Sequence, residues 1–288
     1  MKKILGIVGV LGLLLYIGVP LFASNVAKSS SESSTQNTVA NNNTQATTTP
    51  KEKRVMYITF DDGPSQYTGE LLDVLKKHNA KVTFFLLDTE MKTYPDAVKR
   101  ILSEGHSLGL HGVSHEKNAF YNGTQGPVGE MRQANETLKS IVGQGTQLVR
   151  TPYGSYPYLT KPQKQALYDE SFIIWDWNID SKDWSFRCPE RTFYFTTKAI
   201  NQSKKNPLVI LFHDIKFTPS TMEMFLSWMD EKGYTSEALK PGMEPIMLGV
   251  HKKKPSPSPS ATPSPSPATN KQSTDGPEVL KYKNNNQQ

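Results

Sequence analysis

The middle of the chain alternates between short apolar runs and longer amphipathic runs. Short runs rich in β-branched and aromatic residues are typical of buried strands, whereas apolar residues three or four positions apart are typical of helices. This pattern predicts strands over residues 54–60, 81–87, 106–111, 147–153, 172–180 and 207–214. It predicts helices over residues 68–78, 95–105, 127–143, 161–170, 190–203 and 219–233.

Proline and glycine mark the ends of several predicted helices. Pro95 and Pro219 occupy positions where the first turn of a helix tolerates proline, and Gly105, Gly143 and Gly233 follow the last turns. The repeated order of strand and then helix predicts a parallel sheet with helices packed against it. Six or seven such units favour a closed barrel over an open sheet.

The two ends of the chain differ in composition from the middle. Residues 1–23 contain two lysines followed by a long apolar run, which predicts a signal peptide or a membrane anchor. Residues 24–50 are rich in Ser, Thr and Asn, and residues 252–288 contain a Pro/Ser-rich tract, so both are predicted to be disordered. We expect one folded domain over residues 51–251, exported to the extracellular face or the cell wall and either secreted or anchored.

The formal net charge of +6 lies outside the predicted domain. Residues 1–50 carry a net charge of +2 and residues 252–288 carry +4, so residues 51–251 are neutral overall. A neutral domain lacks the basic surface typical of nucleic-acid binding, and we expect no nucleic-acid partner. The single cysteine, Cys188, excludes an internal disulfide, so the fold must depend on its hydrophobic core.

Ionisable side chains recur at the carboxyl ends of the predicted strands. Active sites of parallel α/β folds lie at these ends, so we expect the side chains to meet at one rim of the sheet. The residues concerned are Asp61, Asp62, His111, Arg150, Tyr153, Asp180, Asp183, His213 and Asp214.

Two histidines four residues apart, His111 and His115, can reach one metal ion from a compact loop. The zinc-protease motif H-E-x-x-H is excluded because Gly112 stands where that motif has its glutamate. Successive strand residues point to opposite sides, so Asp61 and Asp62 are expected to differ in role. We assign Asp62 as the third metal ligand and Asp61 as the general base for an activated water. Two histidines and a carboxylate could also hold iron for oxygen chemistry.

Five stretches, TFDDGP, HGVSH, RTPYG, DSKDW and LFH, occur in this order between residues 59 and 213. In order and spacing they resemble the five motifs of the polysaccharide deacetylases, the NodB-homology carbohydrate esterases. The resemblance implies a distorted (β/α) barrel of about seven parallel strands as a single catalytic domain. It also implies removal of acetyl groups from N-acetylglucosamine polymers such as peptidoglycan or chitin, or of O-acetyl groups from xylan. One departure is Gly112, where the family usually has Ser or Thr, and it predicts a less well braced loop.

The resemblance implies a role for each matching residue near the metal. Asp62, His111 and His115 would be the metal ligands, and Asp61 would be the catalytic base. Arg150 would pair with Asp61, favour its ionised form and fix its direction.

The remaining motif residues are assigned to the substrate by the same resemblance. The backbone N–H of Tyr153 would stabilise the oxyanion of the tetrahedral intermediate. His213 would protonate the leaving amine and would be kept cationic by Asp183. Leu211 and Trp184 would line a small apolar pocket for the acetyl methyl group.

Several other residues have structural interpretations. His106 precedes the histidine pair and is predicted to be structural. Trp175 and Trp177 share one strand face and are predicted to belong to the core. Tyr156 and Tyr158, just after RTPYG, are candidates for a platform on which a sugar ring stacks.

These features predict a metal-dependent hydrolase that removes N-acetyl groups from N-acetylglucosamine residues of a cell-wall polysaccharide. Peptidoglycan is preferred because an export signal and long tethers suit the cell's own envelope. One divalent ion is expected, zinc by default, with cobalt, nickel or manganese as alternatives. The polysaccharide is the expected partner, the membrane is reached only through the N-terminal segment, and a monomer is expected.

Other functions stay open. Within the enzyme class they are chitooligosaccharide deacetylation and O-acetyl xylan esterase activity. Outside it, the chain could be a catalytically silent protein that binds wall glycans. A silent relative is expected to have lost Asp61, Arg150 or His213, and all three are present.

Overall fold

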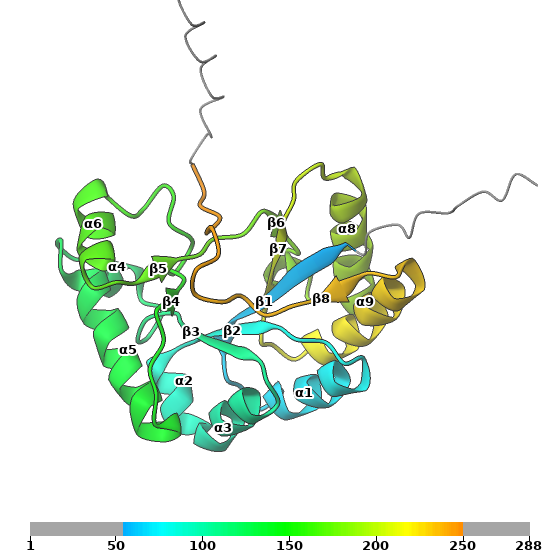
Figure 1. Cartoon of the computed structure of the whole chain (residues 1–288), viewed down its shortest axis with the longest axis horizontal. Helices are drawn as coiled ribbons and strands as arrows, with labels where there is room; N and C mark the ends of the chain where they lie inside the picture. The colour runs from blue at the N-terminus through cyan, green and yellow to red at the C-terminus, as the bar shows by residue number, and fades with distance from the viewer. Residues whose placement is uncertain (1–53, 250–288) are drawn as a thin grey trace, which may run out of the picture. The chain divides into compact units, whose positions relative to one another are not determined.

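A computed structural model describes residues 54–249 of the chain (Figure 1). The predicted signal or anchor segment, the linker and the Pro/Ser-rich tail lie outside these residues. None of the helices within the described range has the length and apolarity needed to cross a bilayer.

The strands form one parallel sheet. Seven of them follow one another in the order β5-β4-β3-β2-β1-β7-β6, and β8 lies beside β1. This half-barrel confirms the predicted distorted (β/α) barrel of about seven parallel strands, but the end strands β5 and β6 do not pair with each other, so the expected full closure is not present among the described strands. The arrangement brings the carboxyl ends of the strands to one edge. The strands are β1 Val55–Gly63, β2 Thr83–Leu86, β3 Ser107–Leu110, β4 Leu148–Val149, β5 Ile173–Ile174, β6 Ile179–Asp180, β7 Leu208–His213 and β8 Thr235–Ser236.

The six predicted helices are all present, with ends within two residues of the expected positions. Gly143 and Gly233 follow the last turns of α5 and α9 in the left-handed conformation, with φ of 78° and 67°, which glycine adopts without strain. Three short helices, α2, α4 and α7, were not predicted. The helices are α1 Thr68–Lys77, α2 Asp88–Thr93, α3 Pro95–Ser103, α4 Lys117–Phe120, α5 Gly126–Val142, α6 Lys161–Asp169, α7 Asp183–Phe186, α8 Pro189–Gln202 and α9 Thr218–Lys232.

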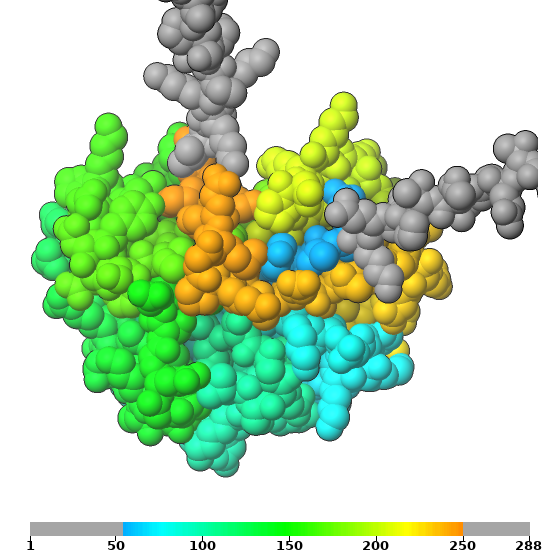
Figure 2. All heavy atoms as spheres, in the orientation of Figure 1, coloured from blue at the N-terminus to red at the C-terminus, as the bar shows by residue number. Residues whose placement is uncertain are grey.

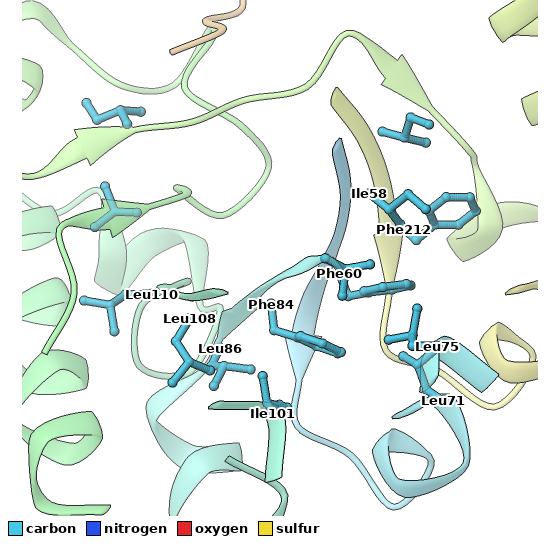
Figure 3. Close-up of a cluster of buried hydrophobic side chains, with 14 of the residues drawn as sticks. Ile58, Phe60, Leu71, Leu75, Phe84, Leu86, Ile101, Leu108, Leu110 and Phe212 are labelled. Atoms are coloured by element: carbon cyan, nitrogen blue, oxygen red, sulfur yellow. The ribbon is translucent and has the colours of Figure 1, made fainter. Parts of the chain in front are cut away.

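The main core lies between the sheet and the helices (Figure 3). Ile58, Phe60 and Phe212 point from β1 and β7 to this side and pack near Leu71 and Leu75 of α1. The rings of Phe60 and Phe212 are 6.0 Å apart between centroids. Burying each such side chain stabilises the fold by about 1.5–3 kcal/mol, which anchors the strands that carry the site.

The residues between these core positions face the barrel interior. Thr59 and Asp61 of β1 both accept a hydrogen bond from the guanidinium of Arg150, so they share this inner face. A second apolar cluster, separate from the main core, consists of Phe85, Leu148, Trp175, Val209 and Leu239. The period-two alternation of the strands therefore separates the helix-facing core from the functional interior.

The predicted single strand over residues 172–180 is wrong. β5 pairs with β4 at one end of the sheet, and β6 pairs with β7 at the other end. Residues 175–178 cross between the two ends. Residues 237–249, which we call the C-terminal strap, run along this crossing, where the N–H of Asp176 donates to the carbonyl of Ile246 at 2.8 Å. Figure 2 shows the strap in orange at the surface between green and yellow-green segments.

Candidate active site

A cavity of about 890 Å³ lies at the carboxyl ends of the strands. Eight of the ten predicted site residues line it, and the other two, Arg150 and Asp183, are buried and contact residues that line it. The eight are Asp61, Asp62, His111, His115, Tyr153, Trp184, Leu211 and His213. The convergence at one rim expected from the strand ends is therefore present, except that Asp214 is buried outside the cavity lining, where its Oδ1 accepts the hydroxyl of Ser65 at 2.9 Å.

A break in the regular geometry of β1 turns the second aspartate towards the first. The pairing of β1 with β2 shifts register between Phe60 and Gly63. Asp62 lies in this break with a φ of 68°, which few residues other than glycine adopt. Asp61 and Asp62 therefore both line the cavity, although regular strand alternation would place them on opposite sides.

Asp62, His111 and His115 form a candidate site for a divalent metal ion, with ligand atoms within 4.8 Å of one another. The Oδ1 atom of Asp62 lies 3.4 Å from Nε2 of His111 and 3.7 Å from Nε2 of His115. Ligands on a tetrahedral zinc ion are about 3.3 Å apart. Oδ1 of Asp62 is also buried without a hydrogen-bond partner. A buried carboxylate oxygen facing two imidazole nitrogens fits a bound cation.

The state of His111 suits metal binding. Its Nδ1 lies 2.8 Å from the carbonyl oxygen of Arg150, so Nδ1 carries the hydrogen and Nε2 keeps its lone pair. Burial lowers the pKa of His111 to about 3, so the ring is neutral at physiological pH. A neutral ring held in this tautomer is the form that ligates a metal.

The loop between the two histidines is braced from α5. The N–H of Val113 donates to Oε2 of Glu130 at 2.8 Å. Gly112 has a φ of 97°, and a Cβ placed there would lie 3.0 Å from the same oxygen and 3.1 Å from Phe120. The family usually has a Ser or Thr hydroxyl at the position of Gly112, and the absence of this hydroxyl was expected to leave the loop less well braced. Glu130 supplies a brace instead, and glycine makes room for it.

Asp61 is buried and paired with Arg150. Oδ1 of Asp61 accepts a hydrogen bond from Nη1 of Arg150 at 2.8 Å, and Nη1 also donates to Thr59 at 2.6 Å. Burial raises the pKa of Asp61 above its ordinary value, while Arg150 acts to lower it. The pairing expected from the motifs is present, and Arg150 acts in the expected direction by favouring the ionised form of Asp61. Desolvation outweighs the guanidinium and makes Asp61 a stronger base.

His213 is held by Asp183. Nδ1 of His213 lies 2.8 Å from Oδ1 of Asp183, whose Oδ2 accepts the backbone N–H of His213 at 2.7 Å. Burial by itself lowers the pKa of His213, but the hydrogen bond and charge of Asp183, with smaller contributions from Asp61 and Asp62, raise it to about 9. The ring is therefore cationic at neutral pH, as an acid for a leaving group must be.

Replacing Asp183 by asparagine is expected to lower the pKa of His213 from about 9 to about 6.5 or below, because the main opposing charge disappears while the burial stays. The proton would then be lost as the pH rises through this lower value. NMR titration of the His213 ring signals measures the pKa directly. An Asp183→Asn protein whose His213 still titrates near pH 9 would contradict this assignment.

The backbone of Tyr153 presents a free N–H. Tyr153 has a φ of 63°, and within the described residues its N–H has no acceptor. Its hydroxyl donates to the carbonyl of His115 at 3.3 Å, and its ring centroid lies 4.5 Å from that of His115. The N–H of the next residue, Gly154, is used within the turn, where it donates to Thr151. Tyr153 is therefore placed beside the metal ligands with an unused donor.

The other aromatic predictions have mixed outcomes. Tyr158 lines the cavity, whereas Tyr156 is not among the lining residues. Trp175 is fully buried as predicted, but Trp177, predicted as core, is only partly buried and lines the cavity as well. Trp184 is exposed at the rim, while Leu211 is almost fully buried at the wall.

Some lining residues were not predicted. Lys216 and Phe217 follow directly after β7, and Arg187 follows α7. The position of Lys216 and Phe217 just beyond a strand end was a usable signal. Arg187 carried no such signal because it follows α7, a short helix that was not predicted.

Comparisons with known proteins agree with this site. The sequence model of the polysaccharide deacetylase family matches residues 48–168. A Bacillus subtilis (strain 168) protein, provisionally named a polysaccharide deacetylase, is 43% identical over 200 residues, which cover 67% of this chain and 70% of that protein. A peptidoglycan-N-acetylglucosamine deacetylase of Bacillus cereus is 39% identical over 193 residues, which cover 65% of this chain and 70% of that protein.

Solved structures give the same result. The crystal structure of a polysaccharide deacetylase from Bacillus cereus matches with a TM-score of 0.63 and 36% identity, covering 68% of this chain and 97% of that one. The barrel, the cavity and the sequence relatives therefore agree. The chain belongs to the polysaccharide deacetylase family.

Proposed function

We propose that the protein is a metal-dependent hydrolase that removes N-acetyl groups from N-acetylglucosamine residues of peptidoglycan. One observation carries the proposal: a single cavity is lined by the three candidate metal ligands, a buried base and a separate cationic acid. Asp61 supplies the base and His213 supplies the acid. Hydrolysis of an amide needs both, because water must lose a proton and the leaving amine must gain one.

The roles of the chain's own residues follow from their positions. A divalent cation held by Asp62, His111 and His115 would polarise the amide carbonyl and lower the pKa of water. Asp61 would take the proton of the attacking water, and its pair with Arg150 keeps the carboxylate directed at that point.

Four other residues that line the cavity are assigned to the substrate. The free N–H of Tyr153 would donate to the oxyanion as it forms. His213 would give its proton to the sugar nitrogen as the C–N bond breaks, so acetate and a free amine are released. Leu211 and Trp184 would contact the acetyl methyl group.

Zinc is the proposed ion because two imidazoles and one carboxylate with open positions are typical of catalytic zinc sites. Cobalt, nickel and manganese accept the same donors, and iron is the remaining alternative. Peptidoglycan is supported by the Bacillus cereus relative named for that substrate. An exported, monomeric enzyme, tethered or secreted through residues 1–23, suits this substrate. Chitooligosaccharides and acetylated xylan are the alternative substrates.

Purified protein is expected to release acetate from an N-acetylglucosamine oligomer and from peptidoglycan. Removal of divalent ions with a chelator should abolish release, since the polarising charge is lost, and zinc should restore it. Acetate assays with zinc, cobalt, nickel and manganese added separately identify the preferred ion, and acetylated xylan tests the esterase alternative. Metal-loaded protein that binds glycan but releases no acetate would instead support a silent binding protein.

A further inference from the structure

One buried carboxylate joins the C-terminal strap to the active site. Asp176 is fully buried on the crossing between β5 and β6. Its Oδ1 accepts the N–H of Ser155 at 2.8 Å, and its Oδ2 accepts the N–H of Leu248 at 2.7 Å and the hydroxyl of Ser155. The two oxygens therefore tie a residue just after the RTPYG motif to a residue of the strap.

The backbone of Asp176 makes two further contacts. Its N–H donates to Ile246 of the strap at 2.8 Å, and its carbonyl accepts Nη2 of Arg150 at 3.0 Å. The neighbouring carbonyl of Trp175 accepts Nε of Arg150, also at 3.0 Å. This crossing segment thus fixes the guanidinium that pairs with Asp61, and the strap fixes the crossing segment.

The strap also packs directly on the loop that carries Tyr153. Gly154 has a φ of 84°, and a Cβ placed there would lie 3.0 Å from both Leu248 and Trp177. Ser155 follows Gly154, and its N–H is held by Asp176. The turn that presents the free N–H of Tyr153 is therefore held in two ways. Asp176 accepts hydrogen bonds from Ser155 at its end, and Leu248 packs against Gly154.

The charge of Asp176 makes this connection strong. Within residues 54–249, no lysine or arginine side chain forms an ion pair with it, so three hydrogen-bond donors from two segments stabilise the carboxylate. Hydrogen bonds to a charged acceptor are stronger than neutral ones, and a buried charge that loses a donor is destabilised. Movement of the strap or the loop would leave this charge short of a donor.

We propose that Asp176 and the strap are positioning elements of the deacetylase reaction, a role that rests on the function proposed above. They hold the N–H of Tyr153 where an oxyanion forms, and they hold Arg150 against Asp61. In the described sheet, β5 and β6 are the two end strands, and no strand pairs with both. The strap contacts the segment that crosses between them and so provides the support that a neighbouring strand would otherwise give.

The test compares substitutions in the full-length, metal-loaded protein. Leu248→Pro removes the N–H that Asp176 accepts, whereas Leu248→Ala keeps it. Asp176→Asn keeps the size of the side chain but places an amide N–H₂ against one of the donors, and Ser155→Ala removes only the hydroxyl. We expect Leu248→Pro and Asp176→Asn to lower kcat by about ten- to a hundredfold with little change in KM, because misplaced groups lose transition-state contacts. Leu248→Ala and Ser155→Ala should lose much less.

Two further readouts separate positioning from general damage. Metal affinity should fall much less than kcat in Leu248→Pro, because among the described hydrogen bonds and ion pairs none of the three ligands contacts Asp176 or Leu248. Hydrogen–deuterium exchange over residues 151–156 should be faster in Leu248→Pro than in Leu248→Ala, and this comparison does not depend on activity. Equal kcat and equal exchange in the two Leu248 variants would overturn the proposal. A wild-type protein that releases no acetate would instead overturn the proposed function. The hydrogen–deuterium exchange of the two Leu248 variants would still test whether the strap holds the loop over residues 151–156.

Discussion

Replacement of Asp61 by asparagine is expected to lower kcat for deacetylation by about 10²–10⁴-fold, the usual contribution of a general base. Asparagine keeps the shape of the side chain and an oxygen that can accept from Arg150, but it cannot take the proton of water. Asp61 is not among the three residues that form the metal-ligand group, so metal binding should persist. Steady-state acetate release gives kcat, and competition with a chromogenic chelator gives metal affinity.

A matched control for this variant is Asp180→Asn. Asp180 also lines the cavity, but its carboxylate accepts the N–H of Lys182 and makes no contact with Arg150 among the described hydrogen bonds. Its loss should reduce kcat by no more than about tenfold. If Asp61→Asn turned over substrate at the wild-type rate with its metal in place, the assignment of the base would be wrong.

Replacement of His111 by alanine is expected to lower affinity for the divalent ion by more than about a hundredfold. This exceeds the loss that is usual when a residue that only hydrogen-bonds to a metal ligand is removed. Only two of three protein ligands remain, and the Nε2 that faces Asp62 at 3.4 Å is lost. Activity should fall with metal occupancy. Calorimetric titration of the metal-free protein with zinc measures the affinity without any assay of activity.

His106→Ala is the matched control for His111→Ala. His106 is also a buried histidine, its Nδ1 accepts the N–H of Val82 at 3.3 Å, and burial lowers its pKa to about 4. Its removal should destabilise the fold by about 2–4 kcal/mol through a cavity and a lost hydrogen bond, yet leave zinc affinity unchanged. The same zinc affinity in His111→Ala as in wild type would refute the proposed ligand set.

Most of the secondary structure could be predicted because local signals agreed with one another. Pro95 lies in the first turn of a helix, and Gly143 and Gly233 follow the last turns of two others in the left-handed conformation. The spacing of apolar residues between such positions predicted the helices. Strand prediction failed over residues 172–180, because an apolar run records burial and not the neighbour with which a strand pairs.

The strand-end residues of the site, such as Asp61 and His213, could be found because parallel strands deliver their carboxyl ends to one edge. Leu211 and Trp184 were found only through the resemblance to the family. The pKa of Asp61 could not be predicted in the same way. Its value depends on the balance between desolvation and the charge of Arg150, and only the packed interior fixes that balance. Glu130 escaped prediction because a single glutamate on an amphipathic helix looks like any solvated side chain.

By itself, the sequence determined the six longer helices, most of the strands, the rim at which the functional residues meet and the identity of the candidate metal ligands. These depend on residue type and on spacing along the chain, which local physics translates directly into structure. Only the tertiary structure decided that Asp62 turns beside Asp61, that Glu130 braces the histidine loop, and that Asp176 joins the strap to Ser155. Such contacts join residues far apart in the chain, and their geometry exists only once the whole barrel has packed.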